Sequence, residues 1–582
     1  VEGPLIEGTK DDALEVLAAA VGEDMADTVA VGDVLVRYEP TENESPSDAA
    51  EGGEPDEEPT PAVSRVGDDD GSDDGPTAAV SRVDEEPSSS AVTRADEAGH
   101  SADEQTDLLV IGAGPGGYVA AIRAAQYGLD VTLVEKDAYG GTCLNRGCIP
   151  SKLLLYHADV LETVERADEF KIDATVENVD FAEIVREVNE EVSGDAESIR
   201  RGLTSSAKHD LFDGEARFVD EKTVEISGGE DDGARLRAET VLIAAGTRPA
   251  VPPIDGIEDV DYLTSTEALQ LETPPERLVI GGGGYIAAEL AHFFGTFGSD
   301  VTIVGRRPNL LPEADDEVAA AFTDRYAERF TLHTGHAATA VSQSNGEFTV
   351  EAQPYEYGEN AGVVEDGEGV TVTGDELLVA AGRVPNTDVL NVEATGVETD
   401  ERGFVETDEY LRTTAEGVWA LGDIVGEYLL KHSANHEART AARNIFGEGL
   451  SAVDYSAMPF AVFASPEVAG VGALEEELQS SGRDYAVNTY QYEDTARGDA
   501  MKADGFVKVL IDPNGEILGC HIIGPEASTL IQEVVVAMKS GSGTVQDIRN
   551  AVHIHPALPE VVDRAFAGQF SRGSSHDHQH HN

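Results

Sequence analysis

Two glycine-rich turns, each between a strand-like run and a helix-like run, constrain this chain more than any other feature. In such a turn the first glycine allows a tight bend, the second lets a pyrophosphate approach the backbone, and the third small residue lets the helix pack on the sheet. Two turns predict two Rossmann-like dinucleotide-binding domains, and therefore an α/β fold that holds two dinucleotides. The turns are Gly112-Ala-Gly114-Pro-Gly-Gly117, after Asp107–Ile111, and Gly282-Gly-Gly284-Tyr-Ile-Ala287, after Arg277–Ile280.

The second strand of each unit distinguishes the two predicted sites. The first unit ends this strand at Glu135, where a carboxylate can accept a hydrogen bond from a ribose hydroxyl. The second unit ends it at Gly305, followed by Arg306 and Arg307. An NAD site has an acid near this position, whereas arginines suit the 2′-phosphate of NADP, unless they are ordinary surface charges. The choice between NAD and NADP therefore stays open.

Cys143 and Cys148, two of only three cysteines, have four residues between them. This spacing predicts a redox pair, and no further cysteine or histidine lies close enough in sequence to complete a zinc site. Pro150 predicts a helix start, which places Cys148 near a helix N-terminus where a thiolate is favoured. We expect Cys148 to be the thiolate and Cys143 the more accessible sulfur. The alternative is a static disulfide or two buried thiols.

The segment Gly140-Gly-Thr-Cys-Leu-Asn-Arg-Gly-Cys-Ile-Pro-Ser-Lys152 resembles the active-site signature of the flavin-dependent pyridine nucleotide disulfide oxidoreductases. The resemblance runs from about Thr106 to about Gln569. It implies FAD at the first dinucleotide site and NAD, or NADP, at the second. We therefore expect two Rossmann-like dinucleotide-binding domains followed by a C-terminal α+β dimerisation domain.

The resemblance also assigns roles to single residues around the cofactors. Tyr285 is expected to gate the nicotinamide side of the flavin, and Glu289 to be a polar partner near the ring. Asp423, in a second FAD motif, is expected to bind the ribityl chain. Lys152 joins these residues as a further cofactor-binding candidate.

Near the end of the chain stands the segment Val552-His-Ile-His-Pro-Ala-Leu-Pro-Glu560. His555 can exchange protons near neutral pH, and Glu560 can orient and charge-stabilise it. The resemblance implies that this element enters the disulfide site of the other subunit of a homodimer. The family more often has Thr and Ser where this chain has Ala557 and Pro559, which leaves the choice of substrate open.

Composition in the N-terminal region and the tail, together with the family resemblance between them, divides the chain into seven predicted segments. Residues 28–39 resemble the closing hairpin of a carrier domain but lack its Asp-Lys-Ala turn, so they are either an unlipoylated remnant or an unrelated hairpin. The segments are a partial lipoyl- or biotinyl-carrier-like piece (1–40), an acidic disordered linker (41–105), an FAD-binding domain (106–260), an NAD(P)-binding domain (261–375), an FAD-binding central domain (376–450), the dimerisation domain (451–570) and a histidine-rich tail without a predicted metal (571–582).

The charge balance limits the partners. Asp and Glu number 113 against 39 Lys and Arg, a formal net charge of −74. Such a surface repels nucleic acid and anionic membranes, and its spread over the whole chain is typical of proteins in concentrated salt. No signal-like or membrane-length apolar run is present. With so few cysteines, a reducing cytoplasm is the expected location.

The resemblance, together with the carrier-like N-terminal piece, implies an enzyme that oxidises dihydrolipoyl groups on the lipoyl domains of a 2-oxoacid dehydrogenase complex and reduces NAD. Cys143 would form the mixed disulfide, Cys148 would face the flavin, and His555 with Glu560 would move the thiol proton. The alternative is an NADPH-dependent reductase of a low-molecular-weight thiol disulfide, which Arg306 and Arg307 favour. A non-catalytic scaffold is a third interpretation, which the intact redox residues oppose.

Overall fold

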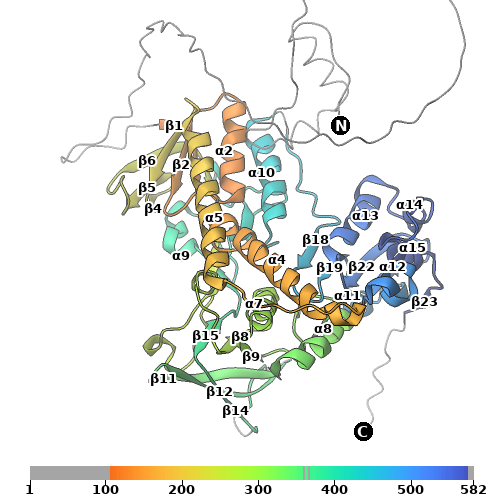
Figure 1. Cartoon of the computed structure of the whole chain (residues 1–582). Helices are drawn as coiled ribbons and strands as arrows, with labels where there is room; N and C mark the ends of the chain where they lie inside the picture. Colours follow the sequence, from red (N-terminus) through yellow and green to blue (C-terminus); the bar gives the residue numbers. More distant parts are fainter. Residues whose placement is uncertain (1–104, 358–360, 365–366, 448, 574–582) are drawn as a thin grey trace, which may run out of the picture. The chain divides into compact units, whose positions relative to one another are not determined.

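The computed structural model describes residues 105–357, 361–364, 367–447 and 449–573. The predicted carrier-like piece, the linker up to residue 104 and the tail beyond residue 573 lie outside these residues. The described part confirms the predicted α/β class, with one mixed sheet, one parallel sheet, two larger antiparallel sheets and a two-stranded pair, packed with helices (Figure 1). The exact boundaries between the predicted domains stay predictions.

The first sheet carries the first glycine turn. Its order is β3-β2-β1-β6-β5-β4, with β17 also paired to β6. Strands β3, β2, β1, β6 and β17 run parallel to one another, whereas β5 pairs antiparallel with β6, and β4 antiparallel with β5. Leu108, Leu109 and Val110 of β1 are fully buried because helices cover the sheet. The bounds are β1 Gln105–Ile111, β2 Val131–Glu135, β3 His209–Asp213, β4 Glu215–Asp220, β5 Thr223–Ser227, β6 Arg235–Ile243 and β17 Val418–Ala420.

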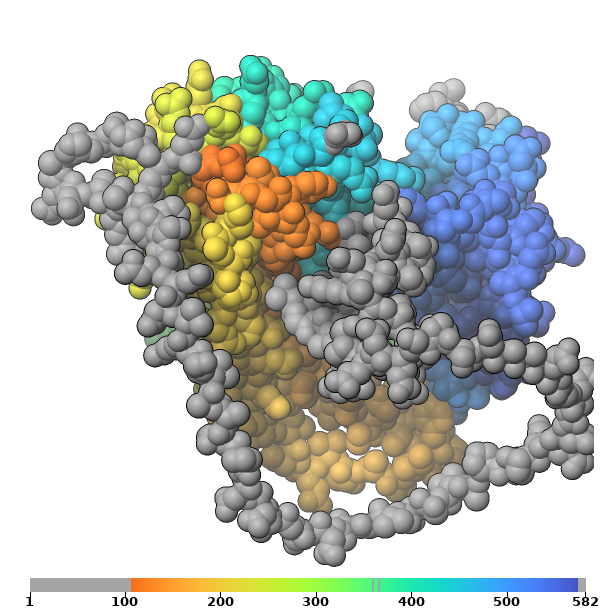
Figure 2. All heavy atoms as spheres, turned by 90° about the horizontal axis from the view of Figure 1, so that it is seen from above, coloured from red at the N-terminus to blue at the C-terminus, as the bar shows by residue number. Residues whose placement is uncertain are grey.

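Three long helices and the redox helices belong to this first unit. Helix α2 packs against α10, and in the space-filling view the orange surface of α2 adjoins the cyan surface of α10 (Figure 2). Asp180 caps α5 by accepting a hydrogen bond from the Glu183 backbone N–H. The bounds are α2 Pro115–Gln126, α3 Gly141–Arg146, α4 Cys148–Glu165, α5 Phe181–Thr204 and α10 Lys431–Phe446, with short helical turns at η2 Arg166–Phe170 and η5 Gly422–Val425.

The second glycine turn belongs to a separate parallel sheet of order β10-β9-β8-β15. Helices α7 and α8 accompany it, and an antiparallel sheet of β11, β12, β13 and β14 adjoins it. The bounds are β8 Arg277–Gly281, α7 Tyr285–Thr296, β9 Asp300–Gly305, α8 Asp316–Arg329, β10 Thr331–Thr334, β11 His336–Ser344, β12 Glu347–Glu356, β13 Gly362–Val363, β14 Val370–Gly374 and β15 Glu376–Val379, with η3 Ile257–Asp259 and α6 Ser265–Ala268 before them.

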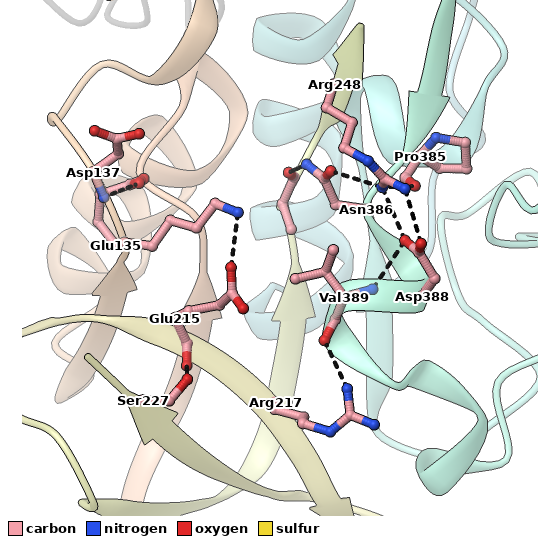
Figure 3. Close-up of polar contacts among 12 residues, drawn as sticks. Glu135, Asp137, Glu215, Arg217, Ser227, Arg248, Pro385, Asn386, Asp388 and Val389 are labelled. Carbon is pink, nitrogen blue, oxygen red and sulfur yellow. Dashed lines mark hydrogen bonds and ion pairs between the residues drawn. The ribbon is translucent and has the colours of Figure 1, made fainter. Parts of the chain in front are cut away.

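Two short strands connect the first unit with the second. Strand β7 (Thr247–Pro249) pairs antiparallel with β16 (Arg383–Pro385). The Arg248 guanidinium donates to the Pro385 carbonyl at 3.0 Å and to both carboxylate oxygens of Asp388 at 2.9 and 2.8 Å (Figure 3). These hydrogen bonds hold β7 close to β16. The chain passes between the first unit and the second through these two strands. Helix α9 (Thr387–Leu390) and η4 (Val392–Thr395) follow.

The C-terminal domain is an antiparallel sheet of order β18-β19-β22-β21-β20-β23. Cys520 lies in β22 and is fully buried. The bounds are β18 Pro459–Val462, β19 Val468–Gly472, α11 Glu475–Ser481, β20 Ala486–Gln491, η6 Tyr492–Asp494, α12 Ala496–Met501, β21 Phe506–Ile511, β22 Ile517–Ile523, α13 Ala527–Ser540, α14 Val545–Arg549, α15 Pro559–Ala567 and β23 Ser571–Arg572.

One hydrophobic core connects α4 with the second unit and the C-terminal domain. It contains Leu154 of α4, Phe293 of α7, Phe322 of α8 and Phe506 of β21, all of them buried. Burying such large side chains together is the main stabilising term in a fold of this kind. Because α4 begins at Cys148, this core fixes the redox helix relative to both neighbours. None of the helices in the described ranges is long and apolar enough to cross a membrane.

Candidate active site

The two cysteines lie on consecutive helices, Cys143 inside α3 and Cys148 as the first residue of α4, and both are free thiols. The Cys143 thiol donates a hydrogen bond to Cys148, which lowers the pKa of Cys148 to about 7. The same contact, together with burial, raises the pKa of Cys143 well above its ordinary value. The positive charge of Lys152 further favours the Cys148 thiolate. The direction of the Cys148 shift is the one that its place at a helix N-terminus predicts.

The accessibility of the two sulfurs is the reverse of our expectation. Cys143 is only 8% exposed, whereas Cys148 is exposed in the chain by itself. The reason is local packing: Cys143 lies with Leu144 on the buried side of α3, while Cys148 begins a helix directly after the Gly147 bend. The sequence spacing indicated a pair but carried no signal for which side of α3 is covered.

Lys152 and Glu289 form an ion pair that connects α4 with α7. The Lys152 Nζ lies 2.7 and 2.6 Å from the two carboxylate oxygens of Glu289, which is buried and also accepts a hydrogen bond from the Phe463 backbone N–H at 3.0 Å. The ammonium group lies 5.0 Å from the centre of the Phe463 ring. The sequence named both residues separately, but it did not indicate that they pair.

The first glycine turn has the shape that a dinucleotide requires. A side-chain carbon on Gly112 would lie 2.5 Å from the Ala244 carbonyl oxygen, and one on Gly117 would lie 1.8 Å from the Gly112 carbonyl oxygen. These two glycines therefore make the tight bend and the close helix packing. A side-chain carbon on Gly114 would meet nothing within 4 Å, so the backbone there is open to a pyrophosphate. The turn fits the adenine dinucleotide half of FAD.

Glu135 lies at the end of β2, directly beside this turn. Its carboxylate accepts hydrogen bonds from the backbone N–H groups of Ala113, at 2.7 Å, and Asp137, at 2.9 Å; the second is drawn in Figure 3. Burial raises the pKa of Glu135. Each carboxylate oxygen can accept a second hydrogen bond, which leaves capacity for the predicted ribose hydroxyl.

Asp423 belongs to a polar chain that the sequence did not reveal. Thr247 Oγ1 donates to Asp423 Oδ2 at 3.1 Å, and Arg383 Nε donates to the same Thr247 oxygen at 2.7 Å. Burial raises the pKa of Asp423, and the Arg383 charge opposes this shift. Arg383 therefore brings a positive charge close to the predicted ribityl site.

Glu437 is a second residue that the sequence analysis missed. It is fully buried in α10, where its carboxylate accepts hydrogen bonds from the Gly422 backbone N–H at 2.6 Å and from the Tyr455 hydroxyl at 2.9 Å. Burial raises the pKa of Glu437 to about 7. Glu437 therefore holds the backbone of the Gly422-Asp423 motif through a carboxyl group that is close to half-protonated near neutral pH.

The second glycine turn repeats the first. A side-chain carbon on Gly282 would lie 2.1 Å from the Ala380 carbonyl oxygen, while Gly284 is open to its surroundings. Tyr285 begins α7 and is 42% exposed, which is consistent with an expected gate. The turn therefore fits a second dinucleotide.

Arg306 and Arg307 follow β9 and are both exposed. Their guanidinium groups lie over the rings of Tyr355 and Tyr357, at 5.7 and 4.2 Å from the ring centres. Among the described residues neither arginine has an ion-pair partner. The two arginines thus lie, without a carboxylate partner, just after the end of β9. The ribose of a bound nicotinamide dinucleotide is expected at this end of the strand.

His555 and Glu560 form the predicted pair. His555 Nδ1 lies 3.0 Å from both oxygens of Glu560, and the hydrogen bond from His555 lowers the pKa of Glu560. The His555 side chain is 71% exposed, and Val552 and Ile554 beside it are exposed apolar residues. Within the described part of one chain, no hydrogen bond or ion pair joins His555 to either cysteine.

A further cluster lies on the opposite end of α4. Asp159, Glu162 and the buried His292 bring ligand-type atoms within 4.8 Å of one another. His292 Nε2 lies 2.9 Å from Asp159 Oδ1, and Arg329 Nη1 lies 3.5 Å from Glu162 Oε1. Because Arg329 already supplies a positive charge, we interpret the cluster as a polar bridge between α4, α7 and α8.

Comparison with known proteins agrees with this geometry. The sequence model described as pyridine nucleotide-disulphide oxidoreductase matches residues 106–442, and the model of the dimerisation domain of these proteins matches residues 458–566.

Similar proteins include enzymes of two kinds. "Dihydrolipoyl dehydrogenase 3" of Haloarcula marismortui is 40% identical over 468 residues, covering 79% of this chain and 95% of that protein. "Mycothione reductase" of Mycobacterium tuberculosis is 37% identical over 477 residues, covering 80% and 99%. A solved structure, the Cu(II) complex of the HOCl-induced flavoprotein disulfide reductase RclA from Escherichia coli, superimposes with a TM-score of 0.70 at 28% identity, covering 80% of this chain and 99% of that one.

Proposed function

Because this chain belongs to the pyridine nucleotide-disulphide oxidoreductase family, we propose that it oxidises dihydrolipoyl groups and reduces NAD, as the dihydrolipoyl dehydrogenase of a 2-oxoacid dehydrogenase complex. It is a flavin-dependent disulfide oxidoreductase of a family that uses FAD and NAD or NADP. The observation that carries the proposal is the Cys143 and Cys148 pair, with the pKa of Cys148 lowered to about 7 beside Lys152.

The thiol chemistry follows from the charge states of the two sulfurs. A substrate thiolate attacks Cys143 in the oxidised pair, so that a mixed disulfide forms and Cys148 leaves as a thiolate. Cys148 suits this role because its anion is the stabilised one. The second substrate thiol then attacks the substrate sulfur of the mixed disulfide, which releases Cys143 and closes the substrate disulfide.

Proton transfer needs a base near Cys143. The partner subunit's His555 would take the proton of each substrate thiol, and Glu560 holds the Nδ1 side of this imidazole through a hydrogen bond at 3.0 Å. The opposite ring nitrogen then remains available to the substrate. The dimerisation domain, matched at residues 458–566, supports the homodimer that this arrangement requires.

The chain's own residues would hold the cofactor in three places. The open backbone at Gly114, in the turn that Gly112 and Gly117 shape, would receive the pyrophosphate. Glu135 would bind the adenosine ribose and Asp423 the ribityl chain. FAD, when bound, accepts the two electrons of the dithiol and passes them to the nicotinamide. The Lys152 and Glu289 ion pair would position the redox helix against this cofactor.

The test is steady-state oxidation of dihydrolipoamide by the purified protein in molar salt, with NAD and NADP compared. We expect turnover with NAD, and loss of that turnover in Cys143→Ser. Absence of dihydrolipoamide oxidation by a preparation that contains FAD would contradict the proposal.

We also propose lipoyl domains as protein partners and, from the cysteine usage, a cytoplasmic location.

A second candidate is an NADPH-dependent reductase of a low-molecular-weight thiol disulfide. Two observations favour it: Gly305 stands where an acid would grip a ribose 2′-hydroxyl, and Arg306 and Arg307 carry no ion pairs within the described residues. The similarity to mycothione reductase points the same way. NADPH-driven reduction of small disulfides, with no turnover of dihydrolipoamide and NAD, would select this candidate. Loss of NADPH affinity in Arg307→Met would confirm the role of the arginine.

A further inference from the structure

The segment that carries His555 connects α14 with α15 in the C-terminal domain (Figure 1). Within the described chain, none of residues 552–556 takes part in a backbone–backbone hydrogen bond. Val552 and Ile554 are 98% and 77% exposed, so these two side chains pack little against their own chain. The position of His555 therefore depends on the polar side-chain contacts of this segment.

His553 is the covered side chain of the segment. It is 9% exposed, against 71% for the His555 side chain. Its Nε2 lies 3.0 Å from Glu533 Oε2 on α13, and its Nδ1 lies 3.9 Å from Asp563 Oδ1 on α15. A protonated imidazole has a donor on each ring nitrogen and can serve both carboxylates. His553 therefore attaches the segment to two helices of its own domain.

Glu533 depends on His553 for its pairing. Its Oε2 bonds to His553, while its Oε1 is buried and has no hydrogen-bond partner among the described residues. Burial raises the pKa of Glu533, and the hydrogen bond and charge of His553 oppose this shift. Burying a carboxylate is costly unless it is paired, whereas a surface ion pair contributes little. The chain thus places a costly carboxylate where it holds His553.

Helix α15 meets both histidines of the segment. Asp563 faces His553, and Glu560 pairs with His555 Nδ1 at 3.0 Å. The two acids are three residues apart, so they lie on the same face of α15. One helix face thus holds His553 and His555 together. Without His553, the Glu560 contact would be the one polar anchor of residues 552–556 among the described residues.

We propose that His553 is a positioning residue, which fixes the segment so that His555 Nε2 reaches the substrate thiol in the partner subunit's site. This inference rests on the proposed role of His555 as the proton acceptor. In that step the S–H bond of the substrate breaks, the proton moves to His555 Nε2, and the electron pair remains on the substrate sulfur. His553 exchanges no proton with the substrate. It acts through distance, because an acceptor works only within hydrogen-bond reach of the proton.

The test measures two activities of the full-length FAD-containing enzyme. Oxidation of dihydrolipoamide by NAD should need His555, whereas reduction of ferricyanide by NADH passes through the cofactors and bypasses the disulfide. The variants are His553→Leu, which removes both contacts, and His553→Gln, whose amide nitrogen keeps a donor for Glu533. The matched control is His521→Leu, in β22 of the same domain. His521 is buried, and its Nε2 lies 2.9 Å from the Ala473 carbonyl oxygen.

We expect His553→Leu to lower kcat for dihydrolipoamide about 10-fold or more while ferricyanide reduction is unchanged. His553→Gln should recover most of this loss, and Glu533→Ala should resemble His553→Leu because it removes the same hydrogen bond. His521→Leu should leave the ratio of the two activities at the parent value. Equal losses of both activities in His553→Leu would overturn the inference, and so would an equally low ratio in His521→Leu.

Crystal structures of the parent and His553→Leu homodimers locate His555 without any substrate. We expect the 3.0 Å contact between His555 Nδ1 and Glu560 to be lost in the variant, or residues 552–556 to be displaced. An unchanged position of His555 would overturn the inference. If His555 moves but the parent enzyme does not oxidise dihydrolipoamide, the inference stands and the proposed function fails.

Discussion

The Lys152 Nζ lies 2.6 Å from Glu289 Oε2, which couples the helix that begins at Cys148 to the first helix of the second dinucleotide unit. The two charges act on Cys148 in opposite directions: Lys152 lowers its pKa and Glu289 raises it. The pair therefore sets the thiolate population as well as the position of α4.

We predict that Lys152→Met raises the pKa of Cys148 from about 7 toward the ordinary cysteine value of about 8.5. The reason is that the thiolate loses its nearby cation while the buried Glu289 carboxylate remains. The ultraviolet absorbance of the thiolate, recorded against pH in the reduced enzyme, measures this shift. Lys152→Arg retains the charge and serves as the control. An unchanged midpoint in Lys152→Met would refute the assigned role.

Cys143 should have two separate effects. Its hydrogen bond should lower the pKa of Cys148, and its sulfur should be needed for the disulfide exchange itself. Cys143→Ala removes the donor and should raise the pKa of Cys148, whereas Cys143→Ser keeps a hydroxyl donor and should raise it less. Both variants should lose turnover. The absorbance of the Cys148 thiolate, recorded against pH, separates the effect on the pKa from the loss of turnover. Equal titration midpoints in the Ala and Ser variants would show that the hydrogen bond does not lower the pKa of Cys148.

Stability should depend on the protonation of Glu437. Its pKa is raised from 4.5 to about 7 in the folded protein, so the folded state binds the proton more tightly than the unfolded state. The stabilisation is present in full below the unfolded pKa and is lost as pH rises through about 7. The shift corresponds to about 3 kcal/mol at most.

Glu437→Gln removes this pH dependence while keeping an acceptor for the Gly422 N–H. We therefore expect the variant to gain stability relative to the parent enzyme as pH rises from about 5 to about 8. Denaturant unfolding at fixed salt and FAD concentration measures the difference. A constant difference across that range would mean that Glu437 has the same pKa in the folded and unfolded states.

A buried lysine holds the second unit to the C-terminal domain. The Lys508 Nζ, on β21, lies 2.7 Å from the fully buried Asp315 Oδ1 and 2.6 Å from Glu475 Oε2. Lys508→Met leaves these acids without a cation and should cost about 3 to 5 kcal/mol of unfolding free energy.

The matched control is Lys539→Met. Lys539 pairs with Asp454 at 2.6 Å, but this pair is exposed, so its loss should cost no more than about 1 kcal/mol. Denaturant unfolding of the two variants gives the comparison. Equal costs would show that the buried network contributes no more than a surface ion pair.

Sharing of the active site between subunits gives a separate prediction. Cys143→Ser and His555→Gln should each abolish turnover as homodimers. If His555 serves the partner's cysteines, a mixed dimer has one site with both residues intact. Random co-assembly should then restore about one quarter of the parent activity. No recovery, despite mixed dimers being detected by native mass spectrometry, would place His555 and Cys143 of the same chain in one site.

Much of the fold could be predicted because its signals are local. The tight bend at Gly112 depends on neighbours within one strand-turn-helix unit, and so does the open backbone at Gly114. The pairing of Cys143 with Cys148 depends on a spacing of five positions and on a helix start. These features need no knowledge of distant residues.

Other features could not be predicted because they depend on distant residues meeting in space. Glu289 meets Lys152 across 137 positions, and Asp315 meets Lys508 across 193. The burial of Cys143 was predicted wrongly because it depends on what covers α3. The sequence by itself therefore determined the kinds of chemistry present: two dinucleotide turns, a redox pair and a histidine-glutamate pair. Only the tertiary structure decided their electrostatics, because Coulomb interactions and desolvation depend on distances that packing sets.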